Sequence, residues 1–219
     1  MHAVNRVDPR RADARENVRQ ILDAARAVFA DRGYEVSIEE VARRSGVGMG
    51  TIYRHFPNKR ALVEEVATGH MDATSEVVTE ALANEPDAWT AFVRVMHHMA
   101  EVRSSQLFPV SRRRTTPSGP ELIAARDRLL AELDRLVRRA QSEGSLRADV
   151  NVHDLVLMMV SLPPRTPQDG EKNTLGTDLT GRHVAVLLDG LRAPGTERLP
   201  GTPAERPDLD EFFRTRFGF

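Results

Sequence analysis

The 219-residue chain contains no cysteine and few aromatic residues. Without cysteine it can form no disulfide, no thiolate metal site and no cysteine nucleophile. No stretch of the sequence stays apolar over the length that a membrane-spanning helix needs. The N-terminus is basic and has no apolar run behind it, so it lacks the form of a secretory signal. From these absences we expect a cytoplasmic protein with no membrane partner.

Sequence patterns for catalysis are also missing. An enzyme such as a small hydrolase is the first alternative to a binding protein, but the chain has no nucleophile elbow, no phosphate-cradling glycine loop and no paired metal motif. Charged residues are abundant and nearly balanced, at 31 Lys and Arg against 32 Asp and Glu. This composition is typical of a soluble, Arg-rich helical protein with one large or two modest domains. We expect neither catalysis nor a cofactor.

A short amphipathic helix is predicted directly after Ser37. Ser37 and Glu40 have the spacing of a capping box, in which the hydroxyl accepts from the third helical amide and the carboxylate from the cap amide. Ile38 and Val41 then fall on one inward side. Gly46 ends this helix, because glycine adopts the left-handed conformation of a tight turn without steric cost.

A second short helix is predicted from its cap at Gly48 to Phe56. Ile52 and Phe56 are one turn apart and should face inward. Tyrosine and histidine on the outer side could bind phosphate oxygens, while threonine, methionine or arginine could meet base edges. A glycine on the first turn would let the backbone approach a sugar-phosphate strand closely. The outward residues are Met49, Gly50, Thr51, Tyr53, Arg54 and His55.

Basic residues are concentrated in the same region. No acidic residue occurs between Glu40 and Glu64. In a nearly neutral chain, such a local excess of positive charge is expected of a phosphate-binding face. Arg43 and Arg60 are the two most readily explained as ordinary surface charges. The basic residues in the interval are Arg43, Arg44, Arg54, Lys59 and Arg60.

The run GMGTIYRHF from Gly48 to Phe56, followed by Asn58 and Lys59, resembles the N-terminal domain of TetR-family transcriptional regulators. Asn58 is a good helix cap, so Lys59 lies at the positive end of the next helix, where phosphate is attracted. Gly48 departs from the family pattern, which usually has Ser or Thr there, so it would contribute only its backbone amide. The DNA-binding residues implied are Ser37, Arg44, Gly48, Met49, Gly50, Thr51, Tyr53, Arg54, His55 and Lys59.

The resemblance implies an all-α protein with two domains. An N-terminal three-helix helix-turn-helix domain would be followed by a C-terminal helical domain that binds a ligand and dimerises. The basic arm at the N-terminus, with Arg10 and Arg11, is either simply disordered or lies along the DNA backbone and minor groove. The expected segments are 1–11, a flexible basic arm; 12–60, the DNA-binding domain with its reader at 37–56; 61–193, the effector-binding and dimerisation domain; and 194–219, a linker and short C-terminal helix.

Apolar residues at three- and four-residue spacing predict the remaining helices. Two of these, 155–162 and the one around 184–191, are apolar on nearly every side. The resemblance implies that they pair across a two-fold axis as a four-helix bundle; the alternative is that they lie at the centre of a monomer. The other helices are expected at 12–32, 59–84, from 87 onward, 121–144 and 208–217. The candidate dimer residues are Leu155, Met158, Met159, Leu162, Val184, Leu187, Leu188 and Leu191.

The helix capped by Asp87 carries a broad apolar face around the single tryptophan. Packing into a core and lining a small-molecule cavity are equally compatible with such a face. His97 and Glu101 share a helix side, but two ligands without a third make a weak metal site, and we expect none. The candidate pocket residues are Trp89, Phe92, Val93, Met96, Met99, Phe108 and Leu133.

Taken together, the resemblance implies a sequence-specific DNA-binding regulator. Its simplest form is a homodimeric repressor that a small-molecule effector releases from a near-palindromic operator, because a two-fold dimer presents two reading helices to successive major-groove segments. A helical protein-interaction adaptor that has the reader's shape without binding DNA is the remaining alternative.

Overall fold

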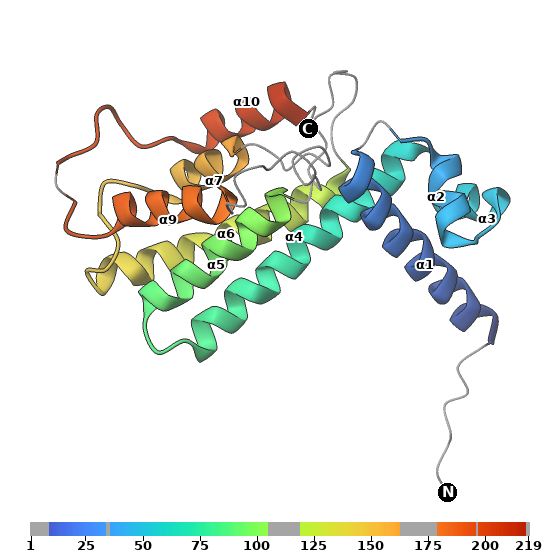
Figure 1. Ribbon diagram of the computed structural model, residues 1–219, viewed down its shortest axis with the longest axis horizontal. Coiled ribbons are helices and arrows are strands. Elements are labelled where there is room, and N and C mark those ends of the chain that lie inside the picture. Colours follow the sequence, from blue (N-terminus) through green and yellow to red (C-terminus); the bar gives the residue numbers. More distant parts are fainter. Residues whose placement is uncertain (1–8, 34–35, 105–118, 163–178, 196, 218–219) are drawn as a thin grey trace, which may run out of the picture.

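The computed structural model describes residues 9–33, 36–104, 119–162, 179–195 and 197–217. Within these residues the fold is all-α, as expected, with nine helices and no strand (Figure 1). None of the described helices combines the length and the apolar character that crossing a membrane requires. The helices are α1 (Pro9–Arg32), α2 (Ile38–Ser45), α3 (Met49–His55), α4 (Lys59–Asn84), α5 (Ala88–Ser104), α6 (Pro120–Ser142), α7 (Val152–Ser161), α9 (Leu179–Leu191) and α10 (Arg206–Phe217).

The N-terminal helices α1 to α3 form a small body with its own core. Ile21 and Phe29 of α1, Val41 of α2, Ile52 of α3 and Leu62 of α4 are all fully buried in it. Helix α1 begins at Pro9, a few residues before the predicted start, because proline fits the first position of a helix, where its missing amide is not needed. This core fixes the angle at which α3 is held.

The C-terminal helices pack around a second, larger core, which includes Phe92, Leu136, Met159 and Leu209. Helix α4 runs from the first body into the second and makes its most extensive contacts with α6 (Figure 1). Its first turns bury side chains in the N-terminal core, and its last turns bury Val78 in the C-terminal core. One continuous helix therefore connects the two bodies.

Helix α10 packs on its own chain, which the sequence could not decide. Leu209 and Phe213 are buried against α7 and its neighbours. Two hydrogen bonds anchor the preceding linker: Asn151 donates to the carbonyl of Ala204, and the amide of Ala204 donates to Asp154, both at 2.8 Å. Helix α10 thus becomes one wall of the C-terminal body.

Candidate functional site

The turn between α2 and α3 has the predicted geometry. Gly46 has φ of 70°, and its amide donates to the carbonyl of Ala42 at 3.0 Å. Gly48 caps α3 with extended backbone and no side-chain hydrogen bond. A Cβ added at Gly48 or Gly50 would meet no atom of the chain within 4 Å. The backbone at the start of α3 is therefore open to an approaching strand.

The predicted capping box of α2 is wrong. The Ser37 side chain makes no cap hydrogen bond. The Glu40 carboxylate instead accepts from Arg43 at 3.0 Å and from Arg32 at 3.1 Å, and these partners lower its pKa. The exposed Ser37 hydroxyl bonds to Glu39 and lowers the pKa of that carboxyl. Two arginines compete for the carboxylate more strongly than one backbone amide, because ion pairs add charge to the hydrogen bond.

The outer side of α3 is narrower than predicted. Tyr53 is 45% exposed and Arg54 is also exposed. Three residues expected to point outward are only partly exposed: Met49 packs against the N-terminal core, His55 is half-buried beside Phe56, and Thr51 is half-buried. A helix of seven residues has few positions, and a two-residue inward stripe leaves its flanking side chains partly covered.

The basic residues near α3 divide into paired and unpaired groups. Arg43 pairs with Glu40, and Arg60 pairs with Glu64 at 2.7 Å. Among the described residues, no ion pair involves the other three, which are Arg44, Arg54 and Lys59.

Lys59 is placed at the N-terminus of α4 by its cap. The Asn58 side chain accepts from the amide of Ala61 at 3.0 Å, as predicted. Lys59 is then the first helical residue, where the helix dipole is positive. The lysine can approach a phosphate at this positive helix end, while Tyr53 and Arg54 extend from the neighbouring helix.

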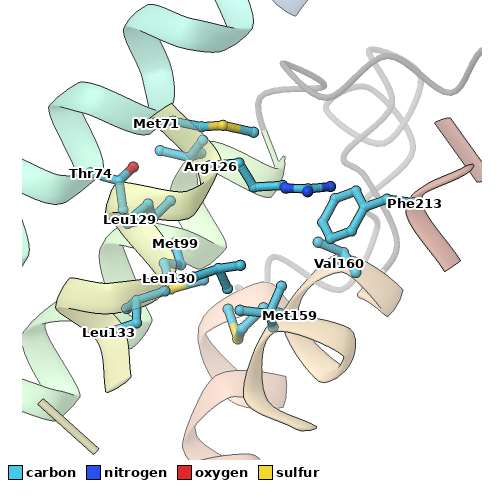
Figure 2. A pocket seen from close by; sticks show the side chains of 12 residues that line it. Met71, Thr74, Met99, Arg126, Leu129, Leu130, Leu133, Met159, Val160 and Phe213 are labelled. Atoms are coloured by element: carbon cyan, nitrogen blue, oxygen red, sulfur yellow. The ribbon is translucent and has the colours of Figure 1, made fainter. Parts of the chain in front are cut away.

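A cavity lies in the C-terminal body between α4, α5, α6, α7 and α10 (Figure 2). Its volume is about 50 Å³ with the side chains as they stand. Its walls are almost entirely apolar. The lining residues are Met71, Thr74, Met99, Val102, Arg126, Leu129, Leu130, Leu133, Val156, Met159, Val160 and Phe213.

Of the predicted pocket residues, only Met99 and Leu133 line this cavity. Trp89 instead stacks on Phe92 with ring centroids 5.7 Å apart and has Arg192 above its ring, so this end of α5 belongs to the core. Val93 and Met96 also pack there, and Phe108 lies outside the described residues. The broad apolar face of α5 packs against the C-terminal core along most of its length, and only its last turns reach the cavity.

Arg126, Met71 and Phe213 were not predicted as pocket residues. The sequence did hold one indication: Arg126 falls at the same helical spacing as the buried Leu122, Leu130 and Leu133 of α6. A basic residue on the apolar stripe of a helix needs a reason, since burying a charge is unfavourable unless it is paired.

A half-buried polar cluster around the buried Thr74 connects α4 with α5 beside the cavity. The Thr74 hydroxyl donates to the carbonyl of His70 at 2.9 Å and lies 3.3 Å from Nε2 of His98. Because the single hydroxyl proton is used, His98 must donate from Nε2. Burial lowers the pKa of His98, so its ring is neutral at pH 7 with the proton on Nε2. Arg26 of α1 approaches from the other side, 3.1 Å from where a Cβ on Gly69 would lie.

Burial lowers the pKa of His70 to about 4, from 6.5, and the charges of Arg26 and His98 act in the same direction. The unfolded chain then binds a proton that the folded chain excludes, so stability is full above pH 6.5 and falls as the pH drops towards about 4. We expect His70→Leu to remove roughly 2 kcal/mol of this pH dependence. Urea unfolding at several pH values gives the free energy of unfolding of each protein as a function of pH. The same dependence on pH in the wild-type protein and in His70→Leu would contradict a His70 that is neutral in the folded chain.

Most candidate dimer residues lie inside the chain. Leu155, Met159, Val184, Leu188 and Leu191 are each at most 7% exposed within the single chain. The remaining three candidates, Met158, Leu162 and Leu187, are half-buried.

Two large apolar side chains are nevertheless exposed, one on α9 and one in the segment before α10. Val186 is 67% exposed and Leu199 is 42% exposed. They border a groove of about 760 Å³, which Met158 and Leu187 also line. Apolar residues beside an open groove are typical of a surface that another molecule covers.

The described residues contain no group of three or more side chains suited to a metal ion. His97 and Glu101, the pair considered from the sequence, are both exposed on α5. The candidate site therefore has two parts, the outer face around α3 and the cavity, and α4 runs from one to the other.

An all-α helix-turn-helix unit joined by a shared helix to a second helical body defines the chain as a protein of the DNA-binding regulator class. Residues 21–66 match the family described as "Bacterial regulatory proteins, tetR family", and residues 84–193 match "Transcriptional regulator SbtR-like, C-terminal domain". The chain belongs to the TetR family of transcriptional regulators.

Similar proteins agree with this assignment. An HTH-type transcriptional regulator of Staphylococcus aureus is 40% identical over 63 residues, which is 28% of this chain and 34% of that protein. The chain thus matches about a third of the length of this curated relative.

Solved structures resemble a larger part of the chain. A TetR regulatory protein from Mycobacterium vanbaalenii is 31% identical, with a TM-score of 0.56, over 83% of this chain and 98% of the other. A TetR-family regulator from Agrobacterium tumefaciens shares the fold, with a TM-score of 0.62 and 18% identity over 82% and 100% of the two chains.

Proposed function

We propose that the chain is a homodimeric, sequence-specific transcriptional repressor that leaves a near-palindromic operator when a small molecule fills the cavity. One observation carries the DNA-binding part: α3 exposes Tyr53 and Arg54, α2 exposes Arg44 nearby in the sequence, and Lys59 is partly exposed on the first turn of α4. None of these three basic side chains has an ion-pair partner among the described residues. On such a face, Tyr53 and Lys59 would hold phosphates, and Thr51 and Arg54 would meet base edges.

The apolar surface of α7 and α9 supports the homodimer. Regulators of this family bind DNA as dimers. Val186, Met158 and Leu187 present apolar surface around a groove large enough to take a helix from a second copy. Sedimentation equilibrium of the full chain tests this, with a mass of two chains expected; a monomer at micromolar concentration would contradict it.

Helix α4 supports the coupling between cavity and DNA. Met71 and Thr74 line the cavity, and Lys59 lies about 18 Å from Met71 along the same helix, at about 1.5 Å per residue. A ligand that occupies the cavity only when α4 tilts would favour one separation of the two reading helices over another. Its differential affinity for the two conformers is what would shift the equilibrium.

A binding titration tests the proposed function directly. Fluorescence anisotropy with duplexes from the DNA upstream of the chain's own gene should find one duplex bound about a thousandfold more tightly than a random duplex of equal length. Thr51→Ala should change the ratio of the affinities for the preferred and the random duplex. Its effect on the affinity for random DNA alone should be smaller. Equal affinity of the wild-type protein for all duplexes would contradict sequence-specific binding to an operator.

A further inference from the structure

The cavity has an uneven distribution of polar groups. Among its described lining residues Arg126 is the only charged one, and Thr74 is the only other polar one. The Thr74 hydroxyl already donates its proton to the carbonyl of His70. The guanidinium of Arg126 is therefore the one strong donor that these lining residues offer to a ligand. In Figure 2 this side chain extends from α6 across the opening towards the ring of Phe213.

Arg126 has fewer partners than its donors require. Its side chain is only 15% exposed, and its Nε atom is buried without a hydrogen-bond partner among the described residues. The nearest carboxylate to Nε is that of Asp127, at 3.6 Å, which is too far for a hydrogen bond. Its closer ion pair joins Nη2 to Asp210 of α10 at 3.2 Å.

The two acidic neighbours of Arg126 mainly serve another arginine. Arg206 donates from Nε to both oxygens of Asp210, at 3.1 and 3.2 Å, and from Nη2 to Asp127 at 2.6 Å. Neither carboxylate is positioned to accept two parallel hydrogen bonds from Arg126. A guanidinium that is buried, charged and incompletely bonded at a cavity is suited to a carboxylate from outside, which it can bind in bidentate fashion.

The walls indicate the rest of the ligand. Leucine and valine side chains from α6 and α7 make up one part, and Met71, Met99 and Met159 make up another. The space open to water-sized molecules is small, but unbranched methionine side chains can change rotamer to admit an apolar chain. A neutral apolar ligand would leave Nε of Arg126 without a hydrogen-bond partner, and a cationic ligand would be repelled by the guanidinium.

We propose that the effector is an amphipathic anion, an apolar chain ending in one carboxylate, whose carboxylate pairs with Arg126 in place of Asp210 while the chain lies between α4, α6 and α7. The role of effector rests on the proposed function, but the binding site itself does not. Because Asp210 belongs to α10 and Met71 to α4, an anion that displaces the first and presses on the second would alter two walls of the cavity at once.

Matched ten-carbon probes test the proposal on the full-length protein. We expect calorimetry to give one decanoate per chain, bound at least about tenfold more tightly than decanol or decylamine. Decyl phosphate separates a carboxylate site from a general anion site: weaker binding than decanoate is the expected result. Equal affinity for decanoate and decanol would overturn the proposal.

Variants locate the anion. Arg126→Gln should weaken decanoate at least about tenfold and leave decanol unchanged. Arg128→Gln is the matched control, since Arg128 lies on the same helix and forms an exposed pair with Asp72 at 2.7 Å, and it should change neither. Asp210→Asn removes the competing carboxylate and should increase the affinity for decanoate by about threefold or more. This variant keeps the proposal testable if Arg126→Gln does not fold. Unchanged decanoate binding in Asp210→Asn or in a folded Arg126→Gln would overturn the proposal.

The same proteins distinguish the two proposals. If wild-type protein binds its operator but decanoate affinity does not depend on Arg126, the anion site fails and the DNA-binding function stands. If decanoate binding depends on Arg126 but no duplex binds, the regulator function fails and the anion site stands.

Discussion

Replacing Arg44 and Lys59 together with alanine is expected to weaken binding to every duplex by at least about a hundredfold at moderate salt. The salt slope should fall by about 1 for each phosphate that the variant no longer neutralises. Both side chains lack ion-pair partners among the described residues, so removing them leaves no unpaired acid behind. Specific and random duplexes should be weakened to a similar degree, since phosphates carry no sequence information. Anisotropy titrations across several salt concentrations measure the slope.

The control for this variant removes a pair instead of a free charge. Glu40→Gln combined with Arg43→Gln deletes the ion pair on α2 and leaves the net charge unchanged. We expect DNA affinity to change by less than about threefold, because exposed pairs contribute little to stability and Arg43 is engaged with its partner. An equal effect in the control and the test variant would contradict the assignment of Arg44 and Lys59 to phosphate binding.

Phe29→Ala is expected to destabilise the N-terminal body of α1 to α3 by about 3 to 5 kcal/mol, because it leaves a cavity in a fully buried position. The two cores are separate clusters, joined by α4 and by a small cluster that includes Met71 and Leu122. The N-terminal body should therefore unfold at a lower temperature, with loss of DNA binding, while the C-terminal body stays folded.

Trp89 makes this prediction measurable. It is the only tryptophan and packs against the C-terminal core, so its fluorescence reports that body alone, while circular dichroism reports both. Ile123→Ala, at an exposed position of α6, should shift neither transition. Coincident transitions at one lowered temperature would contradict the expected independence of the two bodies.

The reader could be predicted from the sequence because its determinants are local. The turn at Gly46, the caps at Gly48 and Asn58, and the inward spacing of Ile52 and Phe56 all lie within a few residues of one another. The capping box at Ser37 was wrong because other side chains compete for Glu40. Arg32 lies eight residues from Glu40 and became a partner for the carboxylate that the capping box required.

The cavity could not be predicted because it depends on packing between distant segments. Met71, Arg126, Met159 and Phe213 come from four helices that adjoin only in the folded chain. An apolar helix face indicates burial, but not which neighbour covers it, and the half-buried Trp89 packs against the C-terminal core and not along this cavity. The same limit affected the apolar helices α7 and α9, whose inner residues are covered by their own chain.

Hydroxyl-radical footprinting of the wild-type protein on DNA from upstream of its own gene tests the central claim most directly. The account predicts two protected segments about one helical turn apart, related by approximate two-fold symmetry, with two chains per duplex. Protection should disappear as salt rises from about 50 to about 200 mM, because phosphate binding releases counterions. A single protected segment, or no protection at low salt, would contradict a dimer that presents the face formed by Tyr53, Arg54 and Lys59 to a duplex.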